Sequence, residues 1–247
     1  MKRRHFLVSS ATAVAAAAST PLVSAAGASS AGVKLKKGDV ILFQGDSITD
    51  ANRSRKTMDL ANNADALGRG YAAIIAGGLL VDHRELELQI FNRGVSGHKV
   101  PQLDKRWQKD TIDMKPAVLS ILIGVNDIWH MLNGKYDGTA EDYRTGFAAL
   151  LERTKKELPD TVLVVCEPFV LRCGAVTDKW FPEFDERKAI AKEVAKAAGA
   201  IWVPFQEAFD DGLAAGTEPK FWAADGVHPT VAGHALMAKT WRKAVGV

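Results

Sequence analysis

The stretch Ile41-Leu42-Phe43-Gln44-Gly45-Asp46-Ser47-Ile48-Thr49 decides the fold of this chain. The apolar run at 40–43 predicts a short buried strand. Gly45 ends that run, and a serine hydroxyl follows two positions later. A serine just past a buried strand lies at the sheet edge where α/β proteins place their reactive groups. Because Gly-Asp-Ser is also a common turn sequence, Ser47 alone could equally be a turn or helix N-cap residue.

The first 31 residues differ from the rest and predict an export signal with a short linker. Lys2-Arg3-Arg4 precedes an uncharged, Ala-rich run, and Val23-Ser24-Ala25 and Ser24-Ala25-Ala26 are both small-residue cleavage sites. The paired arginines resemble a twin-arginine signal. The alternative is a membrane anchor, but Ser, Thr and Pro21 make the run only weakly apolar. We therefore expect a periplasmic or extracellular protein whose single domain spans residues 32–247.

Charge and cysteine content narrow the class of protein. The formal net charge of +3 comes from Lys2-Arg3-Arg4, and the remaining Lys and Arg balance the 29 Asp and Glu. No basic field remains to attract nucleic acid or an anionic membrane, so we expect neither as a partner after signal cleavage. Cys166 and Cys173 without clustered histidines indicate no zinc site, and we expect neither a metal nor a cofactor. An exported protein could hold a disulfide between these cysteines, but two free thiols are favoured, since a domain of this size needs no covalent link. Whether the protein forms a homo-oligomer remains open.

Apolar runs alternate with amphipathic stretches after residue 32. This alternation predicts a three-layer α/β/α fold with one five-stranded parallel sheet. Polar residues alternate with apolar ones in the second strand, which predicts that it lies at an edge. The predicted strands are 40–43, 86–92, 117–123, 161–166 and 200–203. The predicted helices are 69–79, 101–111, 141–158, 184–198, 204–213 and 230–245, with loops at 50–68 and 167–183.

Three predicted strand ends carry polar or small residues suited to chemistry. Ser47 follows the first strand, Gly94 the second and Asn126 the third. In the sheet order 2-1-3-4-5, Ser47 is flanked by the other two at the switch point. The Ser47 and Gly94 N–H groups and the Asn126 amide could then stabilise an oxyanion. Each residue also has a plainer role, Gly94 in a tight turn and Asn126 in a helix cap.

Asp225 and His228, just before the last predicted helix, supply an acid and a base. A carboxylate three residues before a histidine can reach one ring nitrogen and fix the tautomer. The other nitrogen would accept the Ser47 proton while Ser47 attacks a carbonyl carbon to form an acyl-enzyme. Taken singly, Asp225-Gly226 is a common turn pair and His228 a loop residue. The combination at successive strand ends favours catalysis.

The sequence resembles the SGNH hydrolases, also called the GDSL esterase/lipase family, in four blocks. The blocks are Gly45-Asp46-Ser47-Ile48-Thr49, Asn92-Arg93-Gly94-Val95-Ser96-Gly97, Gly124-Val125-Asn126-Asp127 and Asp225-Gly226-Val227-His228-Pro229. The resemblance implies an ester hydrolase with a Ser47, His228 and Asp225 triad. It also implies an oxyanion hole formed by Ser47, Gly94 and Asn126. The chain lacks the Gly-x-Ser-x-Gly elbow of α/β-hydrolases.

Further blocks resemble the bacterial acetylxylan esterases of this family, which deacetylate xylan or xylo-oligosaccharides. They are Gly68-Arg69-Gly70-Tyr71, Ile123-Gly124-Val125-Asn126-Asp127-Ile128-Trp129 and His228-Pro229-Thr230-Val231-Ala232-Gly233-His234. The resemblance implies a short acyl ester on a saccharide as substrate. That subgroup places an aromatic residue immediately before the triad aspartate, whereas this chain has Ala224 there. Trp129, Trp180 and Trp222 fall in predicted rim loops, where they either stack on a sugar or pack the loops.

Two other functions stay open. A lysophospholipase-type acylhydrolase would act on lipids, but the neutral domain shows no long apolar lid or amphipathic surface helix. A non-catalytic carbohydrate-binding protein on a hydrolase scaffold belongs to a different class. Such a protein would not require all of Ser47, Gly94, Asn126, Asp225 and His228.

Overall fold

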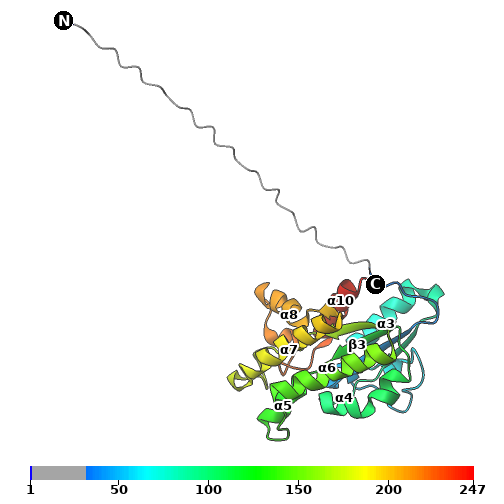
Figure 1. The fold of residues 1–247 in the computed structure, drawn as a ribbon, viewed down its shortest axis with the longest axis horizontal. Coiled ribbons are helices and arrows are strands. Elements are labelled where there is room, and N and C mark those ends of the chain that lie inside the picture. The colour runs from blue at the N-terminus through cyan, green and yellow to red at the C-terminus, as the bar shows by residue number, and fades with distance from the viewer. Residues whose placement is uncertain (2–31) are drawn as a thin grey trace. The chain divides into compact units, whose positions relative to one another are not determined.

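The computed structural model describes Met1 and residues 32–247. The predicted export signal therefore lies outside the described residues. Five parallel strands form one sheet in the order β2-β1-β3-β4-β5, which confirms the predicted fold and strand order (Figure 1). The strands are β1 Val40–Gly45, β2 Gln89–Asn92, β3 Val118–Leu122, β4 Val162–Cys166 and β5 Ile201–Val203. None of the helices in the described part is long and apolar enough to cross a membrane.

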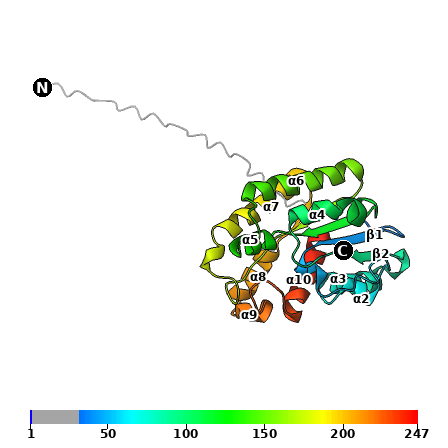
Figure 2. The ribbon, with the colours of Figure 1, turned by 90° about the horizontal axis from the view of Figure 1, so that it is seen from below.

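Helices cover both faces of the sheet (Figure 2). One face carries α4 Val100–Trp107, α6 Ala140–Glu157 and α7 Glu183–Ala198, and a π-helical turn at Gln108–Ile112 extends α4. The other face carries α3 Tyr71–Asp82, α8 Phe205–Ala214 and α10 Val231–Val245. Short helices lie in the connections: α1 Ser47–Asp50, α2 Ala64–Leu67, α5 Val125–Leu132 and α9 Pro219–Trp222. Single 3-10 turns occupy Arg84–Leu86 and Asp178–Trp180.

The buried strands explain why each face has its own hydrophobic core. Leu42 points to the face of α4 and α6, and its neighbours Ile41 and Phe43 point to the face of α3 and α10. This alternation follows from the period of two along a strand. Trp107 on one face and Trp241 on the other are fully buried. The Trp241 indole donates to Ser120 in the middle of β3 at 2.9 Å, so α10 is fixed to the sheet centre.

Strand register determines where the chemistry can lie. Gly45 at the end of β1 pairs with Leu122 at the end of β3, and Phe43 pairs with Asn92 at the end of β2. The three segments that follow these strands therefore leave the sheet along one edge. This edge is the carboxyl edge, where open α/β sheets bind their ligands.

Several predicted boundaries differ from the structure. The second strand begins at Gln89 instead of residue 86, because Glu87 has a left-handed backbone (φ +50°) that interrupts extended structure. The predicted loop 50–68 contains α2, which Asn63 caps through a hydrogen bond from the Ala66 N–H. Helix α5 was not predicted. Gly124 adopts φ +136° and turns the chain directly from β3 into this helix.

Both cysteines are free in the structure. Cys166 is buried at the end of β4, and Cys173 is half-buried in the following loop. The Cys173 thiol donates to the Ala223 carbonyl at 3.3 Å. Free thiols agree with the expectation that a domain of this size needs no covalent staple.

Candidate active site

Ser47 is the first residue of α1, directly after β1. Asp46 caps this short helix by accepting a hydrogen bond from the Ile48 N–H at 3.0 Å. The turn between strand and helix is tight. A Cβ at Gly45 would lie 2.4 Å from both the Leu122 carbonyl and the Thr49 hydroxyl. Glycine at this position therefore lets the chain present Ser47 at the sheet edge.

Ser47, His228 and Asp225 form a continuous chain of hydrogen bonds. The Ser47 Oγ lies 2.8 Å from His228 Nε2, and His228 Nδ1 lies 2.7 Å from Asp225 Oδ2. The second carboxylate oxygen, Oδ1, accepts the backbone N–H groups of Val227 at 2.9 Å and His228 at 2.7 Å. Asp225 thus orients the imidazole so that Nδ1 carries the proton and Nε2 faces the serine.

Electrostatics favour an ionised Asp225. Partial burial acts to raise the pKa of this carboxyl, but the hydrogen bonds from His228 and Val227 outweigh it and hold the pKa below its ordinary value. Side-chain exposure is 44% for His228 and 40% for Asp225, so the pair borders solvent. A carboxylate that stays charged stabilises the imidazolium formed when the serine is deprotonated.

Gly94 lies against the backbone of α1. A Cβ there would be 2.4 Å from the Asp50 nitrogen and 2.8 Å from the Thr49 carbonyl carbon. The Gly94 N–H donates to Asn92 Oδ1 at 2.9 Å, and the Asn92 amide donates to the Thr49 carbonyl at 2.6 Å. Asn92 therefore holds Gly94 beside α1. Asn92 Oδ1 also accepts the Gly94 N–H, which is one of the predicted oxyanion donors. An oxyanion would therefore have to share this N–H with Asn92.

Asn126 lies in the first turn of α5 and is 5% exposed. One hydrogen of its side-chain amide goes to the His98 carbonyl at 3.2 Å. An amide carries two hydrogens, so the second is available to a ligand. The Ser47 N–H at the start of α1 is likewise not used within the helix. The structure thus places the three predicted donors on α1, α5 and the loop after β2, while their catalytic roles stay predictions.

The three predicted sugar-stacking tryptophans have different environments. The Trp129 ring is half-buried in α5 and lies 5.8 Å from the His228 ring. Trp180 is only 2% exposed and packs against Trp129 and Phe184, which favours the alternative of loop packing over sugar stacking. The Trp222 indole donates to the Thr217 hydroxyl at 2.6 Å and packs the α9 segment. Trp129 is therefore the tryptophan best placed to contact a substrate.

Two charged residues, one at the end of α1 and one in the loop after it, hold the Gly94 segment, and sequence reasoning gave them no role. Asp50 Oδ2 accepts the backbone N–H of Ser96 at 3.0 Å and its hydroxyl at 3.1 Å. Arg53 Nε donates to the Gly94 carbonyl at 2.7 Å. Both side chains are buried, at 5% and 7% exposure. Burial is the feature that separates them from ordinary loop charges, and no sequence pattern indicated it.

The two outer blocks of the narrower resemblance meet behind the site. The Tyr71 N–H donates to His234 Nδ1 at 3.1 Å, and the Tyr71 hydroxyl lies 3.0 Å from the Thr49 hydroxyl on α1. Burial, together with the nearby His228, lowers the pKa of His234 to about 4. An uncharged His234 is required for Nδ1 to accept this hydrogen bond. Helix α10 is thereby joined to α3 and to α1.

Two acidic residues next to the site are buried. Burial raises the pKa values of Asp46 and Asp127 to about 7, each against weaker opposing effects. Within residues 32–247, Asp46 Oδ2 and both Asp127 oxygens have no hydrogen-bond partner. Arg187 and Lys99 are the cations that partly offset the burial of Asp127. Neither carboxylate contacts the His228 ring, so neither replaces Asp225 as the orienting acid.

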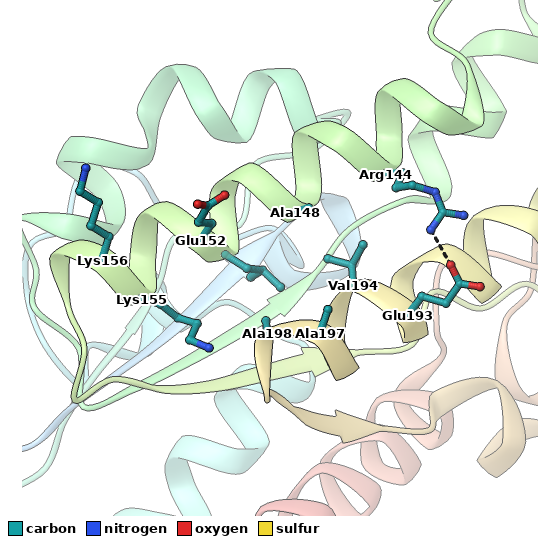
Figure 3. A pocket seen from close by; sticks show the side chains of 10 residues that line it. Arg144, Ala148, Glu152, Lys155, Lys156, Glu193, Val194, Ala197 and Ala198 are labelled. Atoms are coloured by element: carbon teal, nitrogen blue, oxygen red, sulfur yellow. Dashed lines mark hydrogen bonds and ion pairs between the residues drawn. The ribbon is translucent and has the colours of Figure 1, made fainter.

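A groove of about 590 Å³ lies between α6 and α7, on the outer face of these helices (Figure 3). Arg144 and Glu193 form an ion pair across it, and the alanines at 148, 197 and 198 line its floor. None of the predicted catalytic residues lines this groove. This groove is therefore separate from the candidate active site at the carboxyl edge of the sheet.

A parallel sheet of this order, with a serine, histidine and aspartate hydrogen-bonded at its carboxyl edge, defines the class of SGNH ester hydrolases. Residues 43–236 match the model of the GDSL-like Lipase/Acylhydrolase family, and the chain belongs to that family. It is a carboxylic ester hydrolase by this membership. The matched range includes Ser47, Gly94, Asn126 and the segment from Asp225 to His228.

Individual relatives cover most of the chain. An acetylxylan esterase from Geobacillus stearothermophilus is 32% identical over 87% of this chain and 97% of its own length. A crystal structure of that esterase superimposes with a TM-score of 0.77 at 31% identity, again over 87% and 97% of the two chains. A protein described as a GDSL-like lipase, from Parabacteroides merdae, is 46% identical with a TM-score of 0.84, over 87% of this chain and 99% of its own.

Proposed function

We propose that the protein is an exported serine esterase that removes acetyl or other short acyl groups from carbohydrate, such as acetylated xylan or xylo-oligosaccharides. The observation that carries the proposal is the hydrogen-bonded chain from Ser47 through His228 to Asp225. The similarity to an acetylxylan esterase over nearly its whole length supports the substrate class. Trp129 beside His228 supports it further, because an aromatic face can pack on a sugar ring.

The geometry supports a two-step acyl transfer. His228 Nε2 takes the proton of the Ser47 hydroxyl as Oγ attacks the acyl carbon. The negative oxygen of the tetrahedral intermediate lies near the Ser47 and Gly94 N–H groups and the Asn126 amide. As the intermediate collapses, His228 gives the proton to the departing sugar oxygen, which leaves as a hydroxyl, and the acyl group remains on Ser47. Water, deprotonated by His228, then attacks the acyl carbon, and His228 returns the proton to Ser47 Oγ as the acid leaves.

Solvent exposure of the acid–base pair fits a substrate that is itself large and hydrated. His228 and Asp225 border solvent, so an acyl group that projects from a polysaccharide can approach without entering a tunnel. The balanced charge of residues 32–247 fits a neutral saccharide better than an anionic lipid surface. The uncharged run after Lys2-Arg3-Arg4 supports export to the periplasm or beyond.

The test is hydrolysis of 4-nitrophenyl acetate by the wild type and by Ser47→Ala, followed by acetate release from acetylated xylo-oligosaccharides. We expect the variant to lose on the order of 10⁴-fold or more in kcat. Equal rates would refute Ser47 as the nucleophile. Inactivity of the wild type on every ester would favour a binding protein. Faster hydrolysis of lysophospholipids than of acetylated saccharide would replace deacetylation with the lipid-directed alternative.

A further inference from the structure

Arg106 lies on α4, behind the segments that carry the predicted oxyanion donors. Its guanidinium is mostly buried, with 13% of the side chain exposed. Nη1 donates to the Arg93 carbonyl at 2.8 Å, Nη2 to the Gly45 carbonyl at 3.2 Å, and Nε to His98 Nδ1 at 3.2 Å. One side chain thus contacts the segments before Ser47, before Gly94 and beside Asn126.

The guanidinium is also held by two side chains, those of Gln44 and Asp110. Nη1 also contacts the Gln44 side-chain oxygen at 2.7 Å and Asp110 Oδ2 at 3.3 Å. Gln44 is fixed in turn, because its amide donates to the Asp110 carbonyl at 2.7 Å and to the Thr111 hydroxyl at 2.8 Å. Burial lowers the pKa of Arg106 to about 10, so the side chain remains a cation at neutral pH. A planar cation with fixed partners can set the positions of the groups it binds.

The bond to Arg93 acts directly on the Gly94 donor. The Arg93 carbonyl and the Gly94 N–H belong to the same planar peptide unit. A cation that donates to the carbonyl fixes the plane of this unit and polarises its N–H, because hydrogen bonds in a chain strengthen one another. The same N–H contacts Asn92 Oδ1 in the free protein. Arg106 therefore sets both the direction and the strength of this donor.

The bond to His98 acts on Asn126 through one intermediate residue. His98 Nδ1 must be unprotonated to accept from Arg106 Nε. Burial first, and Arg106 second, lower the pKa of His98 to about 4, so the ring is neutral at physiological pH. The carbonyl of the same residue accepts the Asn126 amide at 3.2 Å. Displacing the His98 ring would therefore displace the acceptor that orients Asn126.

We infer that Arg106 is a positioning residue that holds the oxyanion donors of Ser47, Gly94 and Asn126 in register with one another. The inference rests on ester hydrolysis through Ser47. Arg106 does not contact the reacting atoms. It acts through the Gly45 carbonyl, through the Arg93–Gly94 peptide and through His98. A purely structural role for Arg106, as a link between α4 and the sheet, would change stability and leave transition-state binding unaltered.

The test compares Arg106→Lys and Arg106→Gln with Arg242→Lys and Arg242→Gln. Arg242 serves as the control, because it also joins a backbone oxygen, that of Val247 at 3.1 Å, to a carboxylate, that of Asp82, on the surface formed by α3 and α10. Each protein is assayed for kcat and KM on 4-nitrophenyl acetate and for affinity toward a small trifluoromethyl ketone. The ketone forms a hemiketal with Ser47 and places a negative oxygen against the same donors.

We expect Arg106→Gln to lower kcat about 10²-fold, the scale of one lost oxyanion donor, with KM changed less than about threefold. The ketone should bind more weakly by a similar factor. Arg106→Lys should fall between this variant and the wild type, because one ammonium cannot reach all three acceptors. Both Arg242 variants should stay within about twofold of the wild type per folded molecule, since surface changes away from such sites are near neutral.

Unchanged kcat and ketone affinity in Arg106→Lys and Arg106→Gln, per folded molecule, would overturn the inference. Lower thermal stability with unchanged ketone affinity would overturn it as well, in favour of the structural link. If Arg106→Gln does not fold, Arg106→Lys decides, and wild-type ketone affinity in that variant refutes the positioning role. A wild-type protein that binds the ketone but cleaves no acetylated saccharide would refute the proposed substrate and leave Arg106 testable through the ketone.

Discussion

Substitution of Gly94 by alanine should damage catalysis by displacing the nucleophile. The added Cβ would lie 2.4 Å from the Asp50 nitrogen and 2.9 Å from the Thr49 Cβ, whereas ordinary contacts begin at 3.4 Å. Because the nearest atom is backbone, the Gly94 loop and α1 must separate by about 1 Å. Ser47 is the first residue of α1, so the shift moves Oγ relative to the donors. A displacement of that size can cost about 10²-fold in rate, or about 2.7 kcal/mol of transition-state stabilisation.

The assay measures kcat and KM on 4-nitrophenyl acetate, with thermal unfolding of the same samples. Gly77→Ala is the control, because a Cβ at Gly77 in α3 meets no atom within 4 Å. That control should keep wild-type activity and gain about 0.5–1 kcal/mol in the free energy of unfolding, since alanine is the better helix former. Full activity in Gly94→Ala would refute the close approach of the Gly94 loop to α1 as a determinant of catalysis.

Three further predictions concern single side chains at or near the site. Asp225→Asn should lower kcat by on the order of 10³–10⁴-fold, because the amide no longer holds the His228 tautomer. The check is kcat on an aryl acetate for a variant whose circular dichroism spectrum is normal. A loss of less than about tenfold would contradict the prediction. Burial raises the pKa of Asp127 to about 7 in the folded protein. The native state therefore binds more protons than the unfolded state between about pH 4 and pH 7. As a result, the free energy of unfolding falls as the pH rises through this range. The fall in the free energy of unfolding from this one group is on the order of 4 kcal/mol. Urea denaturation across this pH range should show a flatter dependence of that free energy on pH for Asp127→Asn than for the wild type. Parallel pH dependences in the two proteins would contradict the prediction. Trp129→Ala should raise KM for acetylated xylo-oligosaccharide about 3- to 10-fold, the scale of one aromatic contact, and an equal rise for 4-nitrophenyl acetate would exclude a sugar-specific contact.

Much of the fold followed from local patterns in the sequence. Buried apolar runs that end at Gly45, Asn92 and Gly124 predicted three strand ends, and the need to bring their polar residues together predicted the strand order. The boundaries were less accurate. Neither the left-handed Glu87 nor the sharp Gly124 turn into α5 has a signature in apolar periodicity.

The residues around the candidate site were harder to predict than the motif residues. Trp180 was expected at the rim, but its burial depends partly on packing against Trp129 of α5, which lies far away in the sequence. Arg106 donates to the backbone carbonyls of Arg93 and Gly45, and a backbone carbonyl carries no residue-type signal. The Gly45 carbonyl that it contacts lies 61 residues earlier. Tertiary structure alone reveals such a residue.

The exposure of His228 and Asp225 to solvent has a consequence for the synthesis of esters as well as for their hydrolysis. These side chains are 44% and 40% exposed, so the acyl-enzyme of the proposed mechanism would be open to small hydroxyl compounds. Water and an added alcohol would then compete for the same acyl group, and their ratio would set the yields of free acid and new ester. In concentrated short alcohol or xylo-oligosaccharide, the protein should act as a transacylase, and the partition ratio should rise linearly with acceptor concentration.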